Sequence, residues 1–261
     1  MTNQIQHLTE LLSIHRKRLH ILELQAASFG ISMPPHIAIE IEDIKEKIAI
    51  VEVQLKKSEK VASSAKGFYM DTISILFVSA DPTDASRLRL GEEFREIQEK
   101  LKLAKQRDRF KLELPQLSVR PADISQALLD VQPQIVHFSG HGSSTGALCF
   151  ENQVGQTQFV QPDALAALFE QFANQIDCVL LNACYSETQA NAIAEHVEFV
   201  IGMNQAIGDS AAIAFAIGFY QALGAGRTIE ESYKLGNVQI RLQGIPEHLT
   251  PVLVKKGQAQ S

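Results

Sequence analysis

Residues 136–142 read Val-His-Phe-Ser-Gly-His-Gly, and residues 180–186 read Leu-Leu-Asn-Ala-Cys-Tyr-Ser. Each stretch begins as the short apolar run of a buried strand and ends at a residue able to do acid–base or nucleophilic chemistry. The carboxyl ends of parallel strands share one edge of an open α/β sheet, and such sheets place their sites there. The two stretches therefore predict a parallel sheet that brings His141 and Cys184 face to face at that edge.

Around these two strands, apolar runs alternate with amphipathic stretches from residue 72 onward. We expect strands at 72–79, 110–119, 135–139, 178–182 and 199–203, with a β-hairpin at 147–150 and 158–160. We expect helices at 88–103, 122–129, 163–173, 188–197, 211–223 and 228–242. This alternation predicts an α/β fold whose mostly parallel sheet is flanked by helices.

The first sixty residues follow a different pattern. Apolar residues recur at intervals of three and four within 3–28 and again within 37–58, which predicts two long helices packed through one seam. Gly30 suits the end of the first helix and Pro35 the start of the second, so the helices should form an antiparallel hairpin. The predicted division is a helical hairpin at 1–60, a linker at 61–71 and an α/β domain at 72–261.

Composition and charge narrow the function classes. The net charge is −6, and residues 1–66 carry 9 Lys and Arg against 8 Asp and Glu, so the acidity lies in the remainder. No clustered basic surface of the kind that nucleic acid needs is present, so nucleic acid is not an expected partner. Charged residues from Glu10 to Arg18 interrupt any signal-like segment, and the apolar runs are too short to span a bilayer. Three cysteines do not suggest a disulfide framework, which favours the cytoplasm.

The residue types at the two strand ends suit nucleophilic catalysis. A thiol needs a base or a positive field to become a thiolate, and His141 could supply either to Cys184. The helix expected after Cys184, capped by Ser186 or Glu187, would add a partial positive charge. Gly142 lets the backbone pass close to a substrate, and the N–H groups of Gly142 and Cys184 could bind the oxyanion of a tetrahedral intermediate.

Other interpretations of these residues are weaker. A cysteine at the end of a buried strand is often only a small apolar residue, which describes Cys149 and Cys178. His137, His141 and Cys184 could suggest zinc, but no fourth ligand is evident. The glycine-rich run after Ser139 is not followed by the Lys-Ser/Thr pair of a phosphate-binding loop. We therefore expect neither a metal nor a cofactor.

Three motifs carry a family resemblance over about residues 72–254. They are His-Phe-Ser-Gly-His-Gly at 137–142, Leu-Asn-Ala-Cys at 181–184 and Val-Ile-Gly-Met at 200–203. Together they resemble the caspase-like clan of cysteine peptidases and, more narrowly, its bacterial CHAT-type branch. The resemblance implies a caspase-like sheet, with Cys184 as nucleophile, His141 as general base and acid, and endoproteolysis of a protein substrate as the reaction.

The resemblance also suggests residues for a substrate pocket. Relatives that cleave after arginine or lysine often carry an aspartate two residues before the nucleophile, where this chain has Asn182. A neutral amide lacks the charge for a basic residue, so basic specificity does not follow. Asp209 is the other candidate for the pocket, although Asp209 or Ser210 could simply cap a helix that begins at Ala211.

The helical hairpin is similar to small modules that precede effector domains in bacterial defence and regulated cell death. Residues 34–41, Pro-Pro-His-Ile-Ala-Ile-Glu-Ile, carry that similarity. The hairpin could recruit a copy of itself or an adaptor, or only buttress its own domain. The short segment 185–198 leaves no room for a long cleavable linker, so we expect control by partner binding or assembly. The alternatives are a catalytically silent scaffold and acyl transfer to a small molecule.

Overall fold

The computed structural model describes residues 2–29, 34–66 and 72–257. The chain divides into two compact units, Met1–Asp71 and Thr72–Ser261. Among the described helices, none is both long and apolar enough to cross a membrane.

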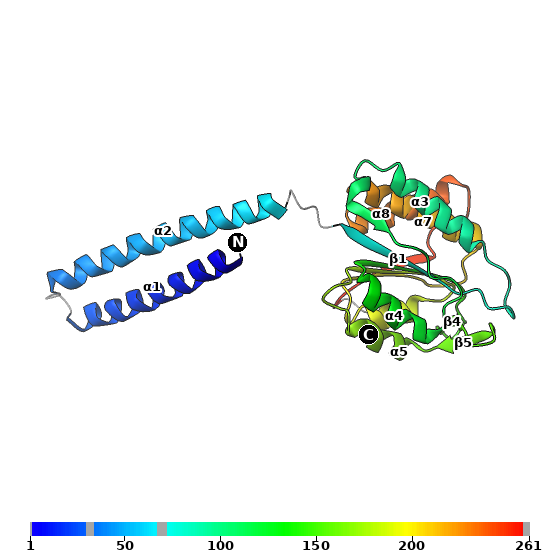
Figure 1. Cartoon of the computed structure of the whole chain (residues 1–261), viewed down its shortest axis with the longest axis horizontal. Coiled ribbons are helices and arrows are strands. Elements are labelled where there is room, and N and C mark those ends of the chain that lie inside the picture. The colour runs from blue at the N-terminus through cyan, green and yellow to red at the C-terminus, as the bar shows by residue number, and fades with distance from the viewer. Residues whose placement is uncertain (1, 30–33, 67–71, 258–261) are drawn as a thin grey trace. The chain divides into compact units, whose positions relative to one another are not determined.

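The first unit is the predicted pair of long helices. Helix α1 covers Thr2–Phe29 and helix α2 covers Pro35–Lys66 (Figure 1). Their seam is built from apolar side chains at helical spacing, and the buried members are Leu12, Leu22, Ile37, Ile44 and Val51. Proline stands at the first position of α2, as expected, whereas Gly30 lies outside the described residues. Helix α2 continues to Lys66, so residues 61–66 of the predicted linker at 61–71 are helical.

Two ion pairs also join the two helices. Arg18 contacts Glu40 at 2.5 Å, and Arg16 contacts Glu52 at 2.8 Å. All four side chains are well exposed, so each pair contributes no more than about 1 kcal/mol. Burial of the apolar seam, rather than the ion pairs, therefore holds the hairpin together.

The second unit is built on a six-stranded sheet in the order β2-β1-β3-β6-β7-β8. The strands are β1 Ile73–Ser79, β2 Phe110–Leu112, β3 Ile135–Ser139, β6 Cys178–Asn182, β7 Phe199–Met203 and β8 Pro251–Lys255. The first five in the order are parallel, and β8 runs antiparallel to β7. The predicted fold class, a mostly parallel sheet flanked by helices, is confirmed.

Two strand predictions need correction. The strand expected at 110–119 stops at Leu112, although the N–H groups of Glu113, Gln116 and Val119 still donate to β1. Pro115 in this stretch has no N–H to donate, so a regular ladder cannot continue through it. Strand β8 was not predicted, because its apolar run is short and its pairing with β7 depends on contacts distant in sequence.

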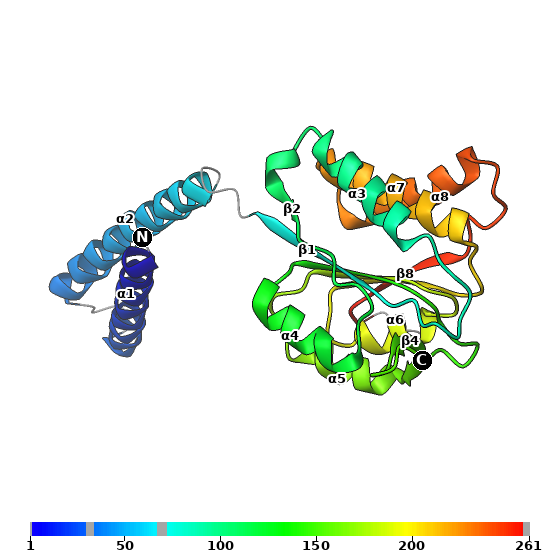
Figure 2. The same ribbon diagram turned by 45° about the vertical axis from the view of Figure 1, so that its right-hand side comes forward.

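Helices cover both faces of the sheet (Figure 2). One face carries α4 Pro121–Val131, α5 Pro162–Glu170, α6 Glu187–Ile193 and the hairpin of β4 Leu148–Glu151 and β5 Thr157–Val160. The other face carries α3 Leu90–Lys102, α7 Asp209–Gly224 and α8 Ile229–Leu242. A single 3-10 turn, Arg107–Arg109, leads into β2. Helix α7 is buried on most sides because it lies beneath both α3 and α8.

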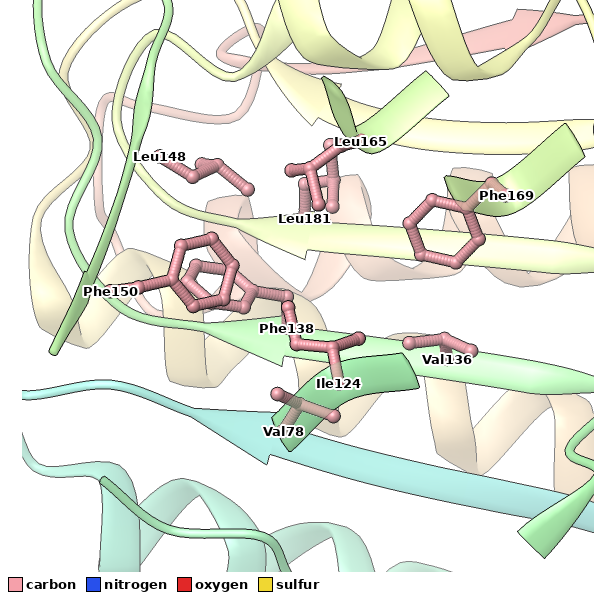
Figure 3. A pocket seen from close by; sticks show the side chains of 9 residues that line it. All are labelled: Val78, Ile124, Val136, Phe138, Leu148, Phe150, Leu165, Phe169 and Leu181. Atoms are coloured by element: carbon pink, nitrogen blue, oxygen red, sulfur yellow. The ribbon is translucent and has the colours of Figure 1, made fainter. Parts of the chain in front are cut away.

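The core on the first face encloses a small apolar cavity of about 20 Å³ (Figure 3). Its wall comes from β1, β3, β4, β6, α4 and α5, and comprises Val78, Ile124, Val136, Phe138, Leu148, Phe150, Leu165, Phe169 and Leu181. No polar surface lines it, so it is a dry packing defect of the core rather than a binding site.

Candidate active site

The structure brings the two predicted strand ends together. Strands β3 and β6 are parallel neighbours, and Ser139 stands opposite Asn182 at their last paired position. His141 and Cys184 each follow two residues later. The N–H of Gly140 donates to the carbonyl of Asn182 at 3.3 Å, which holds the chains together as they leave the sheet.

Gly142 lies directly against the backbone of Cys184. A Cβ added at Gly142 would overlap the carbonyl oxygen of Cys184. Any other residue would push the two segments apart, so the close approach requires glycine here. The segment that carries His141 and the residue that carries the thiol are therefore in van der Waals contact.

The imidazole of His141 is held at one nitrogen. Its Nε2 donates to the backbone carbonyl of Ser86 at 2.7 Å, in the loop that follows β1. A carbonyl oxygen can only accept, so Nε2 carries the proton and Nδ1 is left with its lone pair. Asp81 places a carboxylate oxygen 3.9 Å from the same Nε2. The side chain of His141 is 20% exposed, which leaves it accessible from outside.

The thiol of Cys184 faces the loop after β7. The N–H of Ile207 donates to its Sγ at 3.4 Å, and the thiol can donate to the Ile207 carbonyl at 3.6 Å. The next residue, Tyr185, has a positive φ of 54°, which is uncommon outside glycine, and its N–H donates to Gln205 at 3.2 Å. This tight turn ends β6 and leaves Cys184 half-buried at its top.

The other cysteines differ from Cys184 in environment. Cys149 and Cys178 are both buried, as their positions in apolar runs predicted. Burial, with smaller contributions from Asp84 and Cys184, raises the pKa of Cys149 to about 11. Burial also raises the pKa of Cys178. Neither thiol can supply a thiolate at neutral pH, which leaves Cys184 as the candidate nucleophile.

The predicted oxyanion donors are the N–H groups of Gly142 and Cys184. In residues 72–257, neither group donates to a protein acceptor. The two backbones also lie in contact at the strand ends. Within residues 72–257, both N–H groups are thus uncommitted to a protein acceptor, as an oxyanion site requires.

The structure corrects the interpretation of Asn182. Its side chain is buried, and its amide donates to the carboxylate of Glu93 at 2.5 Å and to the carbonyl of Ala212 at 3.1 Å. The residue therefore joins an internal polar cluster instead of lining an open pocket.

Asp209 also has a partner that the sequence did not suggest. Its carboxylate accepts from the guanidinium of Arg89 at 2.6 Å, and the same guanidinium donates to the hydroxyl of Ser210 at 2.8 Å. Helix α7 begins at Asp209 with Gly208 as its N-cap, and no side chain caps it. The expected cap by Asp209 or Ser210 is therefore wrong.

Ser186 is the N-cap of α6 by position only. Its hydroxyl instead donates to the carbonyl of Leu181 on β6 and accepts from the N–H of Met203 on β7.

Sequence reasoning missed the buried acid Glu93 on α3. Burial raises the pKa of Glu93, but the neighbouring His137 and hydrogen bonds from Ser139 and Asn182 outweigh it, so the pKa lies below its ordinary value. One signal was present in the sequence. Glu93 falls at the spacing of Ile97 and Leu101, on the apolar stripe of the predicted helix, where a charge is unusual.

His137 belongs to the same cluster. Its Nε2 faces Glu93 at 3.0 Å, and its Nδ1 faces the hydroxyl of Tyr220 at 3.1 Å. Both ring nitrogens therefore have buried partners within the protein. Among the residues that the structure describes, no three His, Cys, Asp or Glu side chains gather as a metal site would require.

Two proteins with assigned names are similar to this chain in sequence. A Roc-COR-CHAT protease from an unknown prokaryotic organism is 27% identical over 197 residues, which cover 70% of this chain and 18% of the relative. A protein named "Probable protease" from Gillisia limnaea is 26% identical over 200 residues, which cover 70% of this chain and 35% of the relative. The chain thus matches only a minor part of either relative.

Among solved structures, similarity is found to two cysteine peptidases. Caspase-1 from Spodoptera frugiperda aligns with a TM-score of 0.48 and 13% identity, over 71% of this chain and 86% of that one. The arginine-specific proteinase gingipain R aligns with a TM-score of 0.49 and 14% identity, over 71% of this chain and 46% of that one.

The family match covers most of the chain. The CHAT domain family matches residues 46–246, which include both strand ends, His141 and Cys184. This match confirms the resemblance inferred from the three sequence motifs. The chain belongs to the CHAT domain family.

Proposed function

We propose that the protein is a cysteine endopeptidase that cleaves a protein substrate with a dyad of Cys184 and His141. The observation that carries the proposal is the arrangement at the ends of β3 and β6. The half-buried thiol of Cys184 and the imidazole of His141, one nitrogen of which is bonded to Ser86, follow the ends of adjacent strands, and the backbones of Gly142 and Cys184 lie against each other there. That two relatives are named as proteases supports the same reaction class.

In the proposed reaction, Nδ1 of His141 takes the proton of the Cys184 thiol, and the thiolate attacks the carbonyl carbon of the scissile peptide. The Ile207 N–H, which donates to the sulfur, would favour the thiolate. The carbonyl oxygen becomes an oxyanion and accepts from the N–H groups of Gly142 and Cys184.

Collapse of the tetrahedral intermediate breaks the C–N bond. His141 returns its proton to the departing amine, which leaves a thioester on Cys184. Water then gives a proton to His141 and attacks the thioester. Collapse of this second intermediate breaks the C–S bond and releases the acid, and His141 returns its proton to the sulfur, which restores the thiol. Asp81, 3.9 Å from Nε2, would stabilise the imidazolium that exists between these proton transfers.

The decisive experiment is a proteome-wide survey of new protein N-termini with the wild type and with Cys184→Ala. We expect wild-type-dependent cleavages that vanish in Cys184→Ala and in His141→Ala. A Cys149→Ala variant serves as the matched control, because Cys149 is a buried thiol whose pKa is raised by burial. Cleavage that persists in Cys184→Ala would refute the enzyme and favour a scaffold role.

We further propose that Asp209 contributes to substrate selection. It is the first residue of α7, two positions after Ile207, and its carboxylate is paired with Arg89. A basic substrate side chain would have to compete with Arg89 for this carboxylate. The residue preferences in the same survey test the proposal, because Asp209→Asn should change them and leave total cleavage of a permissive substrate largely intact.

The α1–α2 hairpin is proposed as the assembly module, with a second copy as its partner. Four large apolar side chains project from it into solvent: Ile14, Ile21, Ile39 and Ile50 are 61%, 47%, 70% and 50% exposed. The spacings of 7 and 11 residues keep each pair on one stripe of its helix. Between the isoleucines, α1 carries Lys17 on its stripe, whereas α2 carries Glu46 and Asp43, the latter paired with Lys47 of its own helix. Packing of α1 on α2 of a second copy would therefore match apolar with apolar and basic with acidic.

Assembly of this kind would control activity without a cut in the chain. Only α6 and a short turn separate Cys184 from β7, so segment 185–198 offers no long loop for cleavage. Intact-mass spectrometry of the active enzyme should find the chain whole. The three cysteines favour a reducing compartment, so we propose the cytoplasm as its location. By family resemblance, we propose bacterial defence or regulated cell death as its setting.

A further inference from the structure

A charged side chain occupies the interior directly behind the candidate dyad. Glu93 on α3 is 3% exposed, although burying a carboxylate costs several kcal/mol unless hydrogen bonds and charges compensate for it. The rest of the buried stripe of α3 is apolar, with Ile97 and Leu101 at the following turns. Packing alone does not account for an acid at this position.

The Glu93 carboxylate is satisfied by both strands of the site. One oxygen accepts from the hydroxyl of Ser139 on β3. The other accepts from the amide of Asn182 on β6 at 2.5 Å and faces His137 Nε2 on β3 at 3.0 Å. These contacts join segments 44 to 89 residues apart in the sequence.

The position of these partners along the strands gives the cluster its significance. Ser139 and Asn182 are register partners, opposite each other at the ends of β3 and β6. Ser139 precedes His141 by two residues, and Asn182 precedes Cys184 by two residues. A single carboxylate therefore bridges the two strands at the last paired position before the imidazole and the thiol.

We propose that Glu93 is a positioning residue, whose carboxylate sets the separation of His141 and Cys184 by bridging Ser139 and Asn182. The inference rests on the proposed dyad. A displacement of about 1 Å between reacting groups can cost on the order of a hundredfold in rate. Loss of the bridge should therefore slow thiol activation without removing any group that touches the substrate.

Alkylation of Cys184 by iodoacetamide tests this in the full-length protein, because it reports thiolate reactivity and needs no substrate. The rate constant is measured against pH by mass spectrometry of the Cys184 peptide. We expect Glu93→Gln, which keeps the shape of the side chain, to lower the rate by about tenfold or more. Glu99→Gln, an exposed acid on the same helix, should match the wild type.

Further variants separate positioning from fold stability. Ile97→Val opens a small gap on the buried stripe of α3 and should lower the Tm while leaving the alkylation rate of the folded protein unchanged. Ser139→Ala removes one arm of the bridge and should give a smaller loss of rate than Glu93→Gln. It is the deciding variant if Glu93→Gln does not fold.

The outcomes are distinguishable from those of the proposed function. A wild-type rate in Glu93→Gln, or in Ser139→Ala if that variant decides, would overturn the positioning role. An equal loss of rate in Ile97→Val would also overturn it, since general loosening would then explain the effect. If instead His141→Ala alkylates as fast as the wild type, the dyad itself fails.

Discussion

At the scale of single residues, the candidate site depends on backbone geometry as much as on its two reactive side chains. The carbonyl of Ser86 sets the tautomer of His141, and the backbone N–H of Ile207 donates to the sulfur of Cys184. Gly142 allows the segments that carry His141 and Cys184 to touch. Such contacts involve no distinctive side chains, so they leave little trace in the sequence.

Gly142 provides a direct residue-scale prediction. Gly142→Ala places a methyl group on the carbonyl of Cys184, so we expect a loss of about 1–3 kcal/mol of stability and a strong fall in Cys184 reactivity. Calorimetry and iodoacetamide labelling would measure the two effects. Gly91→Ala is the matched control, because nothing lies within 4 Å of its added Cβ and α3 should gain slightly in stability. Normal labelling in Gly142→Ala would contradict the close contact.

Asp81 gives a second prediction at this scale. Its carboxylate faces His141 at 3.9 Å, so Asp81→Asn should slow turnover about fivefold through loss of roughly 1 kcal/mol of imidazolium stabilisation. The ratio kcat/KM on a substrate from the N-terminal survey measures it. Asp108→Asn, an exposed acid distant in sequence from the dyad, is the control. Unchanged turnover in Asp81→Asn would remove Asp81 from the mechanism.

At the scale of elements, the loop after β1 is tied to the β4–β5 hairpin. The carboxylate of Asp84 accepts from both the hydroxyl and the N–H of Thr157, at 2.8 and 2.9 Å, at the start of β5. The hydroxyl first and the N–H second lower the pKa of Asp84. This loop also contains Ser86, which holds His141. The contact therefore stabilises the wall on which the histidine rests.

The lowered pKa of Asp84 predicts how this contact depends on pH. A carboxyl group with a depressed folded-state pKa stabilises the fold above its unfolded-state pKa, and the effect is lost as the pH falls through the folded value. Asp84→Asn should therefore lower the Tm at neutral pH, and the difference from the wild type should shrink in acid. Calorimetry across that range measures it. A difference that is constant with pH would show that the ionised carboxylate does not contribute.

At the scale of the whole molecule, the exposed isoleucines of the hairpin predict self-association. Ile39→Asp combined with Ile50→Asp should shift the full-length protein to a smaller species in light scattering after gel filtration. Ala49→Asp is the control, because Ala49 is exposed but lies about 100° around α2 from Ile50. A wild type that is monomeric at every concentration tested would contradict the homotypic contact.

Much of this molecule is recoverable from local patterns. Strand and helix order follow from apolar periodicity, and β3, β6 and β7 match their predicted ranges. The identity of His141 and Cys184 follows from two chemically distinctive residues at the ends of apolar runs. These signals are local, because each depends on residues within one turn or one strand of each other.

Other features exist only in the folded molecule. The buried contact of Glu93 with Asn182 joins residues 89 positions apart in the sequence. The ion pair of Arg89 with Asp209 joins residues 120 positions apart. Strand β8 likewise depends on its distant neighbour β7. From sequence alone, a charged or amide side chain is expected to be exposed to solvent. Its burial costs desolvation free energy, which only hydrogen-bond partners from another segment can offset. The sequence therefore determined which residues could do chemistry. Only tertiary packing determined the polar cluster around Glu93 that lies behind them, because its members come from distant segments.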